Sequence, residues 1–375
     1  MSSPGPLHLE AWWSVTESSW YRRNEIPCQS APPGIAKYAP LLEVGTGQDI
    51  FLNMDRFGRV IDYLRISVTD RCNERCLYCM PEGYKGWAQK SDHLTADEII
   101  RVAAAACGIG FRKFRLTGGE PCIRKDLIQI AGGISRQPGV QSLGLSTNGT
   151  RLATLAGPLR EAGVDSVNIS LDALGAALYR KIAGGEVSAV HAGIQAARSA
   201  GISRVKLNCV MMRGINEGEI WPLIHFAAER ELPIRFIELM PVSKTDVLTE
   251  ENFLSVQEVM SRLAERDELS AMDFPHLGHG PARYYRLAKS GATVGFIGAM
   301  TKSDFCSGCN KIRLTADGKI RPCLGRHNEL DLLGALRHGA SGVEQLLREA
   351  IEAKPEDHEF GSCYQPGRPM TAIGG

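Results

Sequence analysis

The sequence predicts an α/β fold, a partial (β/α)6 barrel that carries a smaller C-terminal α+β unit, and three observations lead to it. Six short β-rich runs alternate with helical runs between residues 61 and 240, a pattern typical of parallel βαβ units. Residues suited to ligand binding follow most of these runs, and barrels bind ligands at that rim. The alternation stops near residue 249. A doubly wound sheet, which also binds ligands at strand ends, is the alternative.

Residues 1–48 contain Ser, Pro and Gly with three tryptophans but no sustained periodicity. This composition predicts a poorly ordered extension, to which we assign no function. Residues 49–248 are expected to form the barrel. Its strands are expected at 63–68, 113–117, 141–147, 165–171, 203–212 and 234–240, and its helices at 95–108, 124–135, 152–163, 187–201 and 217–231.

Residues 249–375 are expected to form the C-terminal unit. Two strands are predicted at 283–288 and 292–300, and a helical segment near 329–353. Between them, Asp317-Gly318 separates two arms of alternating apolar residues, which is a strong hairpin signal. The chain ends in a Gly/Pro-rich tail that finishes Gly374-Gly375.

The charge balance excludes several classes of partner. Lys and Arg number 43 against 42 Asp and Glu, a net charge of +1, so bulk electrostatics favours neither nucleic acid nor an anionic membrane. No apolar run approaches the ~18 residues of a membrane-spanning helix, and the amino terminus lacks an apolar secretory core. We therefore expect a cytoplasmic protein. Six of the eleven cysteines lie in two tight clusters, which favours metal over disulfides.

The first cluster is Cys72, Cys76 and Cys79, spaced CxxxCxxC directly after the first expected strand. A structural zinc site and a conventional iron–sulfur cluster each take four protein ligands. Three ligands leave one metal position open, which is where a metal site performs chemistry. The alternative is a structural zinc loop completed by a distant ligand such as His93.

The second cluster is Cys306, Cys309 and Cys323, a CxxC pair and a third cysteine across the predicted hairpin. A hairpin brings its two ends together, so three thiolates meet again with no fourth cysteine nearby. A zinc site completed by His327, or chance proximity, is the alternative. Once the first loop is interpreted as an iron–sulfur site, a second iron–sulfur cluster with an open iron is the better interpretation of this set.

Other residues mark the rim of the barrel. Gly118, Gly119 and Glu120 follow the second strand, where paired glycines permit close backbone approach to a ligand and the carboxylate could bind a cationic amine. Residues 146–149, residues 170–172 and Met240 end strands three, four and six. Each alone is typical of a strand-end cap or a core methionine, but together they trace one rim.

Basic residues within the expected strands form a third group. Lys113 and Arg115 alternate onto one face of a strand, and charged residues are rarely buried unpaired. A barrel with inward-facing cations should therefore bind a polyanion, and with two more cations on the facing hairpin the ligand is of triphosphate size. The cations are Arg65, Lys113, Arg115, Lys206, Arg235, Lys311 and Arg313.

The motifs LRISVTDRCNERCLYCMP, RLTGGEP, NISLDAL, IRFIELMP and CSGCNKIRLTADGKIRPCL, with the terminal Gly-Gly, resemble the GTP 3′,8-cyclases of molybdenum-cofactor biosynthesis, the MoaA family of the radical S-adenosylmethionine (SAM) superfamily. The resemblance covers about residues 50 to 375. It implies a TIM-like radical SAM barrel with two [4Fe-4S] clusters. It also implies a lyase that converts GTP to (8S)-3′,8-cyclo-7,8-dihydroguanosine 5′-triphosphate after a 5′-deoxyadenosyl radical abstracts the ribose 3′ hydrogen.

The resemblance also assigns roles. The catalytic Cys72, Cys76 and Cys79 would hold the SAM cluster, and Cys306, Cys309 and Cys323 the auxiliary cluster. Tyr78, Gly119, Glu120, Ser170 and Met240 would surround SAM. The GTP site would comprise Arg65, Arg115, Ser146, Lys206, Lys311 and the catalytic Arg313, to which the strand argument adds Lys113 and Arg235.

Two positions depart from the family pattern. Lys311 stands where arginine is usual, which keeps the charge but loses the forked geometry, and Ser146 stands where threonine is usual. Implied partners are GTP, an unidentified electron donor and a downstream pterin-forming enzyme, and a homodimer is left open. The rival functions are a radical SAM peptide maturase with an auxiliary cluster and a zinc-stabilised nucleic-acid-binding module.

Overall fold

The structure is a computed structural model that describes residues 53–80, 93–272, 280–338, 341–361 and 364–374. These residues all belong to one compact unit, Gln48–Gly375. The predicted extension over residues 1–48 lies outside the described residues, as do Cys28, Cys363 and Gly375.

All six expected barrel strands form, and they lie side by side in chain order as parallel neighbours. The expected bounds differ from the observed ones by at most two residues. The strands are β1 (Tyr63–Ser67), β2 (Lys113–Thr117), β3 (Ser142–Thr147), β4 (Ser166–Ser170), β5 (Arg204–Met211) and β6 (Ile234–Glu238).

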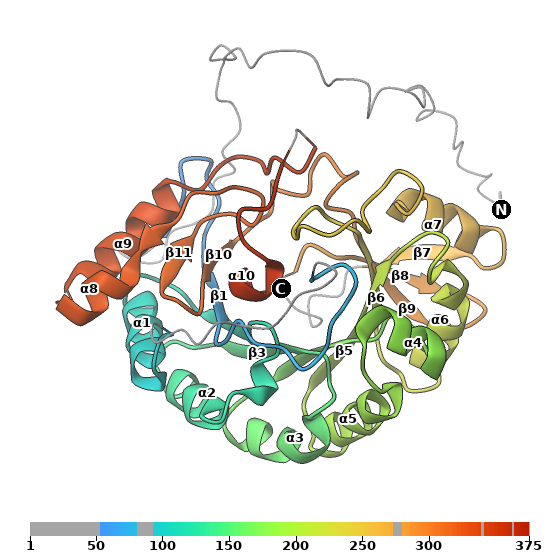
Figure 1. The fold of residues 1–375 in the computed structure, drawn as a ribbon, viewed down its shortest axis with the longest axis horizontal. Coiled ribbons are helices and arrows are strands. Elements are labelled where there is room, and N and C mark those ends of the chain that lie inside the picture. Colours follow the sequence, from blue (N-terminus) through green and yellow to red (C-terminus); the bar gives the residue numbers. More distant parts are fainter. Residues whose placement is uncertain (1–52, 81–92, 273–279, 339–340, 362–363, 375) are drawn as a thin grey trace, which may run out of the picture. The chain divides into compact units, whose positions relative to one another are not determined.

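Helices cover the outside of this sheet (Figure 1). The first begins at a capping box in which Thr95 and Glu98 satisfy each other's backbone N–H groups. A helix after β4, α4 (Ala176–Ala183), was not predicted, because its eight residues are fewer than the window in which periodicity identifies a helix. The others are α1 (Ala96–Gly108), α2 (Leu127–Ser135), α3 (Leu152–Glu161), α5 (Val187–Ser199) and α6 (Ile220–Ala228), with short 3-10 turns at Pro121–Ile123 and Glu217–Glu219.

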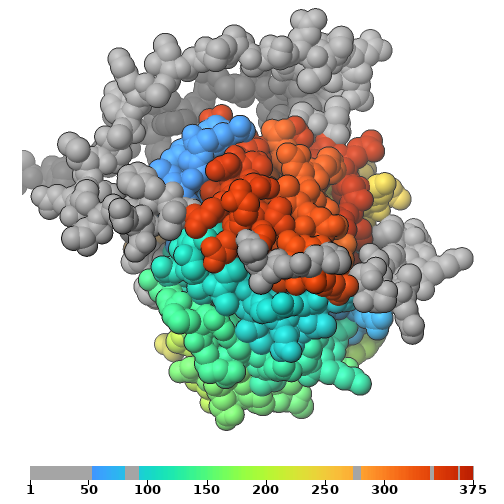
Figure 2. Space-filling model, turned by 90° about the vertical axis from the view of Figure 1, so that its left-hand side faces the viewer, coloured from blue at the N-terminus to red at the C-terminus, as the bar shows by residue number. Residues whose placement is uncertain are grey.

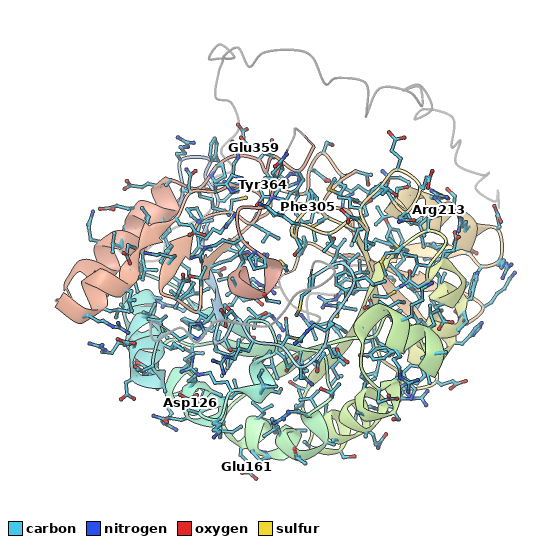
Figure 3. The ribbon with its side chains drawn as sticks, viewed as in Figure 1. Asp126, Glu161, Arg213, Phe305, Glu359 and Tyr364 are labelled. Atoms are coloured by element: carbon cyan, nitrogen blue, oxygen red, sulfur yellow. The ribbon has the colours of Figure 1, made fainter. Side chains whose placement is uncertain are left out.

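Each strand divides its side chains between a core and a cavity, as β1 illustrates. Leu64 and Ile66 are fully buried in the main apolar core shared with the helices, whereas Tyr63 and Arg65 line the cavity. Polar residues on the outer helices, such as Asp126 at the start of α2 and Glu161 at the end of α3, lie at the periphery (Figure 3). The period-two alternation of a strand thus places the basic residues inside.

The C-terminal residues extend the sheet at both edges. Strand β10 (Lys311–Leu314) pairs in parallel with β1, and β9 (Thr293–Ile297) pairs in parallel with β6. Beyond β10 in the sheet lie the antiparallel strands β11 (Lys319–Arg321) and β12 (Leu330–Asp331). Beyond β9 lie β8 (Arg283–Leu287) and then β7 (Leu269–Met272). Among the described residues the sheet has 12 strands and is not closed, so the partial barrel is confirmed. The boundary near residue 248 stays a prediction.

The expected hairpin at Asp317-Gly318 is present between β10 and β11, with Gly318 at φ +78°. The segment expected to be one helix over 329–353 instead forms β12, α8 (Leu332–His338) and α9 (Ser341–Glu352), and α9 packs against α1. Figure 2 shows the C-terminal residues lying on the early barrel elements. Two further helices are α7 (Val256–Ala264) and α10 (Met370–Ile373).

A second, smaller apolar cluster lies in the C-terminal region. It is built from Val242, Ala299, Phe360 and Tyr364, with Phe305 packed against it (Figure 3). No helix in the described part of the chain is long and apolar enough to cross a membrane.

Candidate active site

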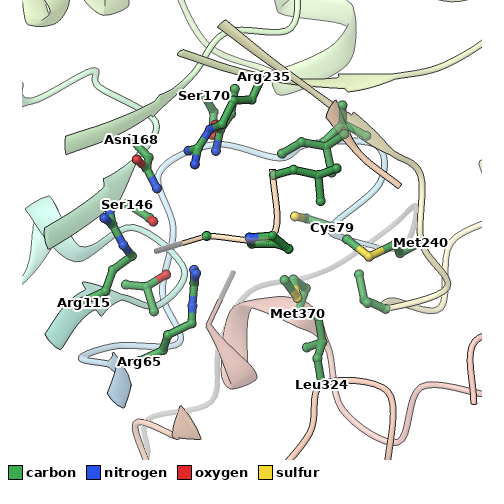
Figure 4. A pocket seen from close by; sticks show the side chains of 18 of the residues that line it. Arg65, Cys79, Arg115, Ser146, Asn168, Ser170, Arg235, Met240, Leu324 and Met370 are labelled. Atoms are coloured by element: carbon green, nitrogen blue, oxygen red, sulfur yellow. The ribbon is translucent and has the colours of Figure 1, made fainter. Parts of the chain in front are cut away.

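A cavity of about 380 Å³ lies among the strands, within the size range of ligand pockets. Its walls come from the inner faces of β1 to β6, the first cysteine loop and the C-terminal hairpin. Figure 4 shows Arg65, Arg115, Ser146 and Asn168 on one side of the pocket and Cys79 and Met240 on another. Every site residue predicted from the sequence lines this cavity.

The first cysteine loop is held by α4. The backbone N–H of Arg75 donates to the carbonyl of Ala183 at 2.7 Å, and that of Leu77 donates to the carbonyl of Ile182 at 2.9 Å. The Tyr179 hydroxyl, almost fully buried, donates to Glu74 Oε1 at 3.0 Å. Three backbone and side-chain contacts therefore fix the CxxxCxxC loop to a helix that the sequence did not reveal.

The donor set of the loop fits a polynuclear cluster. Burial raises the pKa of Cys72 to about 11 and that of Cys79 to about 12, so positive metal charge is what would keep these thiols ionised. Within the described residues, no three His, Cys, Asp or Glu side chains are arranged to hold a single metal ion. The fourth ligands of the zinc alternatives, His93 and His327, do not line the cavity that contains both cysteine sets; His93 faces Asp70 at 3.3 Å and His327 stacks on Tyr364.

The second cysteine set lies at the open end of the hairpin, as the spacing predicted: Cys306 and Cys309 precede β10, and Cys323 follows β11. Cys306, Cys309 and Cys323 all line the cavity. Burial opposes ionisation of Cys309, yet the positive charges of Lys354 and Lys311 lower the pKa of this thiol to about 7. In the first set, by contrast, the positive charge of Arg75 lowers the pKa of Cys72 by less than burial raises it.

The Gly-Gly-Glu turn lies against the first cysteine loop, and both of its glycines line the cavity. A Cβ on Gly119 would lie 2.2 Å from the Arg71 carbonyl oxygen, and Gly118 has φ +148° with its own Cβ position 2.3 Å from the Thr69 carbonyl oxygen. The glycines thus allow close approach to the backbone of the loop that leads to Cys72. Gly119 N–H donates to the Thr69 carbonyl at 2.8 Å.

Glu120 is buried and its carboxylate is held in place. It accepts hydrogen bonds from Thr147 Oγ1 at 2.7 Å, Asn148 N at 2.7 Å and Cys122 N at 2.9 Å. Burial raises the pKa of Glu120. The Cys122 thiol also hydrogen-bonds this carboxylate, so the orientation of Glu120 is fixed from several sides.

Asp172 fixes Tyr78, a pairing that sequence reasoning missed. The Tyr78 hydroxyl donates to Asp172 Oδ2 at 2.7 Å, and Val210 N–H donates to Asp172 Oδ1 at 2.8 Å. Burial raises the pKa of Asp172 to about 6. The only available signal was its position two residues after Ser170 at a strand end.

The strand register places three arginines in one row. Arg313, Arg65 and Arg115 are direct partners across β10, β1 and β2. Gly144 is the next partner in the row on β3. Burial and the neighbouring Arg313 lower the pKa of Arg65 to about 9, which leaves it charged at neutral pH.

Neutral acceptors hold Arg115 in place. Its guanidinium donates to the Tyr63 hydroxyl at 2.6 Å, to the Leu145 carbonyl at 2.7 Å and to Ser166 Oγ at 3.0 Å. Tyr63 was missed by the sequence analysis, although it lies two residues before Arg65 and so faces the same side. These neutral contacts orient Arg115 without cancelling its charge.

Lys206 and Arg235 continue the cationic lining. Burial and the positive charges of Arg235 and Arg115 lower the pKa of Lys206 to about 6. Asn168 Oδ1, beside Lys206 in register, is a buried acceptor with no hydrogen-bond partner within the described residues. A hydroxyl or amine of a bound ligand would satisfy it, so the lining fits a polar ligand.

Two predicted cations have other contacts as well. Lys113 Nζ lies 2.6 Å from Asp62 Oδ2, so its charge is already matched by a carboxylate. Lys311 donates to Asn310 Oδ1 at 2.9 Å, and its ammonium lies 5.4 Å from the centre of the Tyr63 ring. Lys113 therefore has a carboxylate partner, whereas Arg115 in the row is held by neutral acceptors.

The chain end enters the site. Arg313 Nη1 donates to the Gly374 carbonyl at 2.6 Å. Gly374 has φ +88°, and a Cβ there would lie 2.8 Å from Thr117 Cγ2 and 3.1 Å from Ser67 Cβ. In Figure 1, α10 accordingly lies inside the ring of strands.

Comparisons with known proteins match the geometry. One family model, the Radical SAM superfamily, matches residues 66–227, and another, Molybdenum Cofactor Synthesis C, matches residues 232–360. A GTP 3′,8-cyclase of Pseudomonas putida (strain W619) is 42% identical over 333 residues, covering 86% of this chain and 98% of that protein. A GTP 3′,8-cyclase of Pelotomaculum thermopropionicum is 43% identical over 324 residues, covering 86% and 99%. The chain belongs to the GTP 3′,8-cyclase family.

As a member of this family and of the radical SAM superfamily, the chain is an enzyme whose chemistry involves SAM and an iron–sulfur cluster. Streptococcus suis SuiB bound to precursor peptide SuiA aligns with a TM-score of 0.54 at 14% identity, over 75% of this chain and 66% of that one. Native anSMEcpe with bound AdoMet aligns with a TM-score of 0.53 at 15% identity, over 80% and 82%. These two likenesses concern the fold alone.

Proposed function

We propose that the protein is a GTP 3′,8-cyclase that converts GTP to (8S)-3′,8-cyclo-7,8-dihydroguanosine 5′-triphosphate, an early step of molybdenum-cofactor biosynthesis. The observation that carries the proposal is a single cavity lined both by two three-cysteine sets and by a row of buried cations. The first feature suits two [4Fe-4S] clusters with open irons, and the second suits a triphosphate.

The first cysteine set would hold the cluster that binds SAM. When bound, SAM and this cluster supply a 5′-deoxyadenosyl radical, which is chemistry of the cofactor and not of the protein. The chain's own residues position it: Tyr78 is oriented by Asp172, and Glu120 by Thr147 and Asn148. Gly119, Ser170 and Met240 complete the proposed SAM contacts.

The cations would bind the triphosphate. Arg65, Arg115 and Arg313 lie in adjacent strands, and besides burial the positive charges of Arg313 and Arg115 lower the pKa of Arg65 while no polyanion is bound. A triphosphate reverses this repulsion, because each contact becomes a charge-assisted hydrogen bond. The proposed site also includes Ser146, Lys206, Arg235 and Lys311, with Lys113 at its edge.

The second cysteine set would hold an auxiliary cluster near the guanine base, and Arg313 would link the substrate to the tail through Gly374. We further propose a cytoplasmic location, an electron donor and a downstream pterin-forming enzyme as partners, and leave a homodimer open. A peptide maturase would have no use for the buried cation row, and the balanced charge gives a nucleic-acid-binding module no support.

The test is hydrogen transfer from labelled substrate. The enzyme is reconstituted anaerobically with iron and sulfide, then given SAM, a reductant and GTP deuterated at the ribose 3′ position. We expect deuterium in the 5′-deoxyadenosine and a cyclised nucleotide by mass spectrometry. GTP deuterated at the ribose 4′ position is the matched control. SAM cleavage without deuterium transfer from the 3′ position would refute the proposed reaction.

A further inference from the structure

The side chain of Lys354, which sequence reasoning missed, is only 2% exposed. Its ammonium donates to the Lys311 carbonyl at 2.8 Å and to the Pro322 carbonyl at 3.0 Å, and it also hydrogen-bonds the Cys309 thiol. An ammonium has three N–H donors, so each of them has an acceptor. A buried ammonium is costly unless it is satisfied in this way.

Both carbonyls belong to segments that carry cysteines. Lys311 lies two residues after Cys309, and Pro322 directly precedes Cys323. The ladder of β10 and β11 pairs Leu314 with Ile320 and ends at Arg313 with Arg321, so neither carbonyl lies within it. Lys354 therefore joins the two hairpin arms at the level where the cysteines lie.

The residues after Lys354 contact the remaining cysteine. The guanidinium of Arg59 donates to the Cys306 carbonyl at 3.0 Å, to the Glu356 carbonyl at 2.8 Å and to the Pro355 carbonyl at 2.6 Å. The backbone N–H of His358 hydrogen-bonds the Cys306 thiol. The short segment 354–358 thus contacts Cys306 and Cys309 directly and the Cys323 arm through Pro322.

We propose that Lys354 is a positioning residue of the second iron–sulfur cluster, which holds Cys309 and Cys323 at their binding positions and places a buried positive charge beside the cluster. This inference rests on the proposed function, because the second cluster is part of it. Reduction adds one negative charge to a cluster, and a neighbouring ammonium that also hydrogen-bonds a ligand sulfur stabilises that reduced form. Loss of Lys354 should therefore make the midpoint potential more negative.

The experiment isolates the second cluster. In full-length protein, Cys72, Cys76 and Cys79 are replaced with alanine, so that the iron that remains, about four per chain, belongs to the second set. Lys354→Met is added, and the cluster is titrated by EPR-monitored reduction. Lys319→Met is the matched control, because Lys319 lies in the same hairpin but is 30% exposed and pairs with Asp331 at 2.9 Å.

We expect a more negative midpoint and weaker iron retention in Lys354→Met, and no change in Lys319→Met. Lys354→Arg keeps the charge and should stay near the parent midpoint. If Lys354→Met binds no cluster, Lys354→Gln is titrated instead. An unchanged midpoint and iron content in the methionine or glutamine variant would overturn the inference while leaving the proposed function standing. Absence of iron from the triple-alanine parent would instead show that there is no second cluster.

Discussion

At the scale of single residues, the inward cations need neighbouring residues that are small enough to leave space for their side chains. Gly144 has no side chain at the point where Arg115 crosses β3, and a Cβ there would lie 2.4 Å from Arg115 Nη2. Gly295 plays the same part for Arg235, whose Cγ would lie 2.9 Å from an added Cβ. Small residues beside the inward cations are therefore part of the binding site, although they carry no chemistry.

Gly144→Ala should displace the Arg115 guanidinium and weaken GTP binding by about tenfold, since overpacking of this kind costs about 1–3 kcal/mol. Calorimetric titration of GTP into the anaerobic enzyme measures it. Gly157→Ala is the control, because a Cβ at Gly157 in α3 meets nothing within 4 Å. Wild-type affinity in Gly144→Ala would mean that Arg115 does not contact the nucleotide.

The lowered pKa of Lys206 leads us to expect that GTP binding depends on pH. Burial and its cationic neighbours lower its pKa to about 6, so Lys206 is mostly neutral at pH 8 in the free protein. A triphosphate raises this pKa, so the complex binds more protons than the free protein and affinity should increase as the pH falls from 8 to 6, by at most about tenfold per unit.

The measurement is calorimetry in two buffers of different ionisation enthalpy, which reports protons taken up on binding. Lys206→Met should lose that proton uptake, and the difference between the two proteins removes the contribution of the phosphate itself. Equal uptake by wild type and Lys206→Met would assign the proton to another group.

At the scale of elements, the sequence pattern missed one helix and two strand pairings that help to build the site. Periodicity predicted all six barrel strands and the hairpin, because each carries a local alternation of apolar residues. It missed α4, whose Tyr179 and backbone carbonyls hold the cysteine loop. It also missed that β9 and β10 join the barrel, because pairing between distant strands leaves no local signal.

The tail is the element whose removal should separate SAM cleavage from cyclisation of GTP. Deleting Gly374 and Gly375 removes the carbonyl that accepts from Arg313, while neither cysteine set is touched. We expect normal iron content and SAM cleavage but strongly reduced cyclised product, measured by mass spectrometry. Gly374→Ala should act in the same direction, because its Cβ would collide with Thr117. Unchanged product yield in both variants would show that the tail has no role.

At the scale of the whole described unit, residues as far apart in the sequence as Tyr63 and Thr371 meet in one cavity. The spacing of cysteines, the alternation of cations and the family resemblance together assigned roles to nineteen of its lining residues. Tyr63, Asn168 and Lys354 were not among them. Tyr63 and Asn168 follow from strand alternation once the inward face is known, whereas Lys354 follows a helix and is brought to Cys309 only by tertiary packing.

Two cysteine sets in one cavity predict about eight iron and eight sulfide per reconstituted chain. Replacing Cys72, Cys76 and Cys79 with alanine should halve that content and abolish SAM cleavage. Cys107→Ala should change neither, because Cys107 lies buried in α1, away from the cavity. Elemental analysis after anaerobic purification measures the metals. Stoichiometric zinc with no iron uptake would contradict the radical chemistry.

The open sheet has a consequence for the order in which the protein can be made. Strands β1 and β6 receive their outer neighbours, β10 and β9, only after residues 293–314 have been synthesised. Until then the nascent barrel presents two unpaired edges, the kind of surface that joins other chains. Ribosome-bound chains that end near residue 248 should therefore need chaperones, and the last third of the polypeptide acts as the protein's own protection against aggregation.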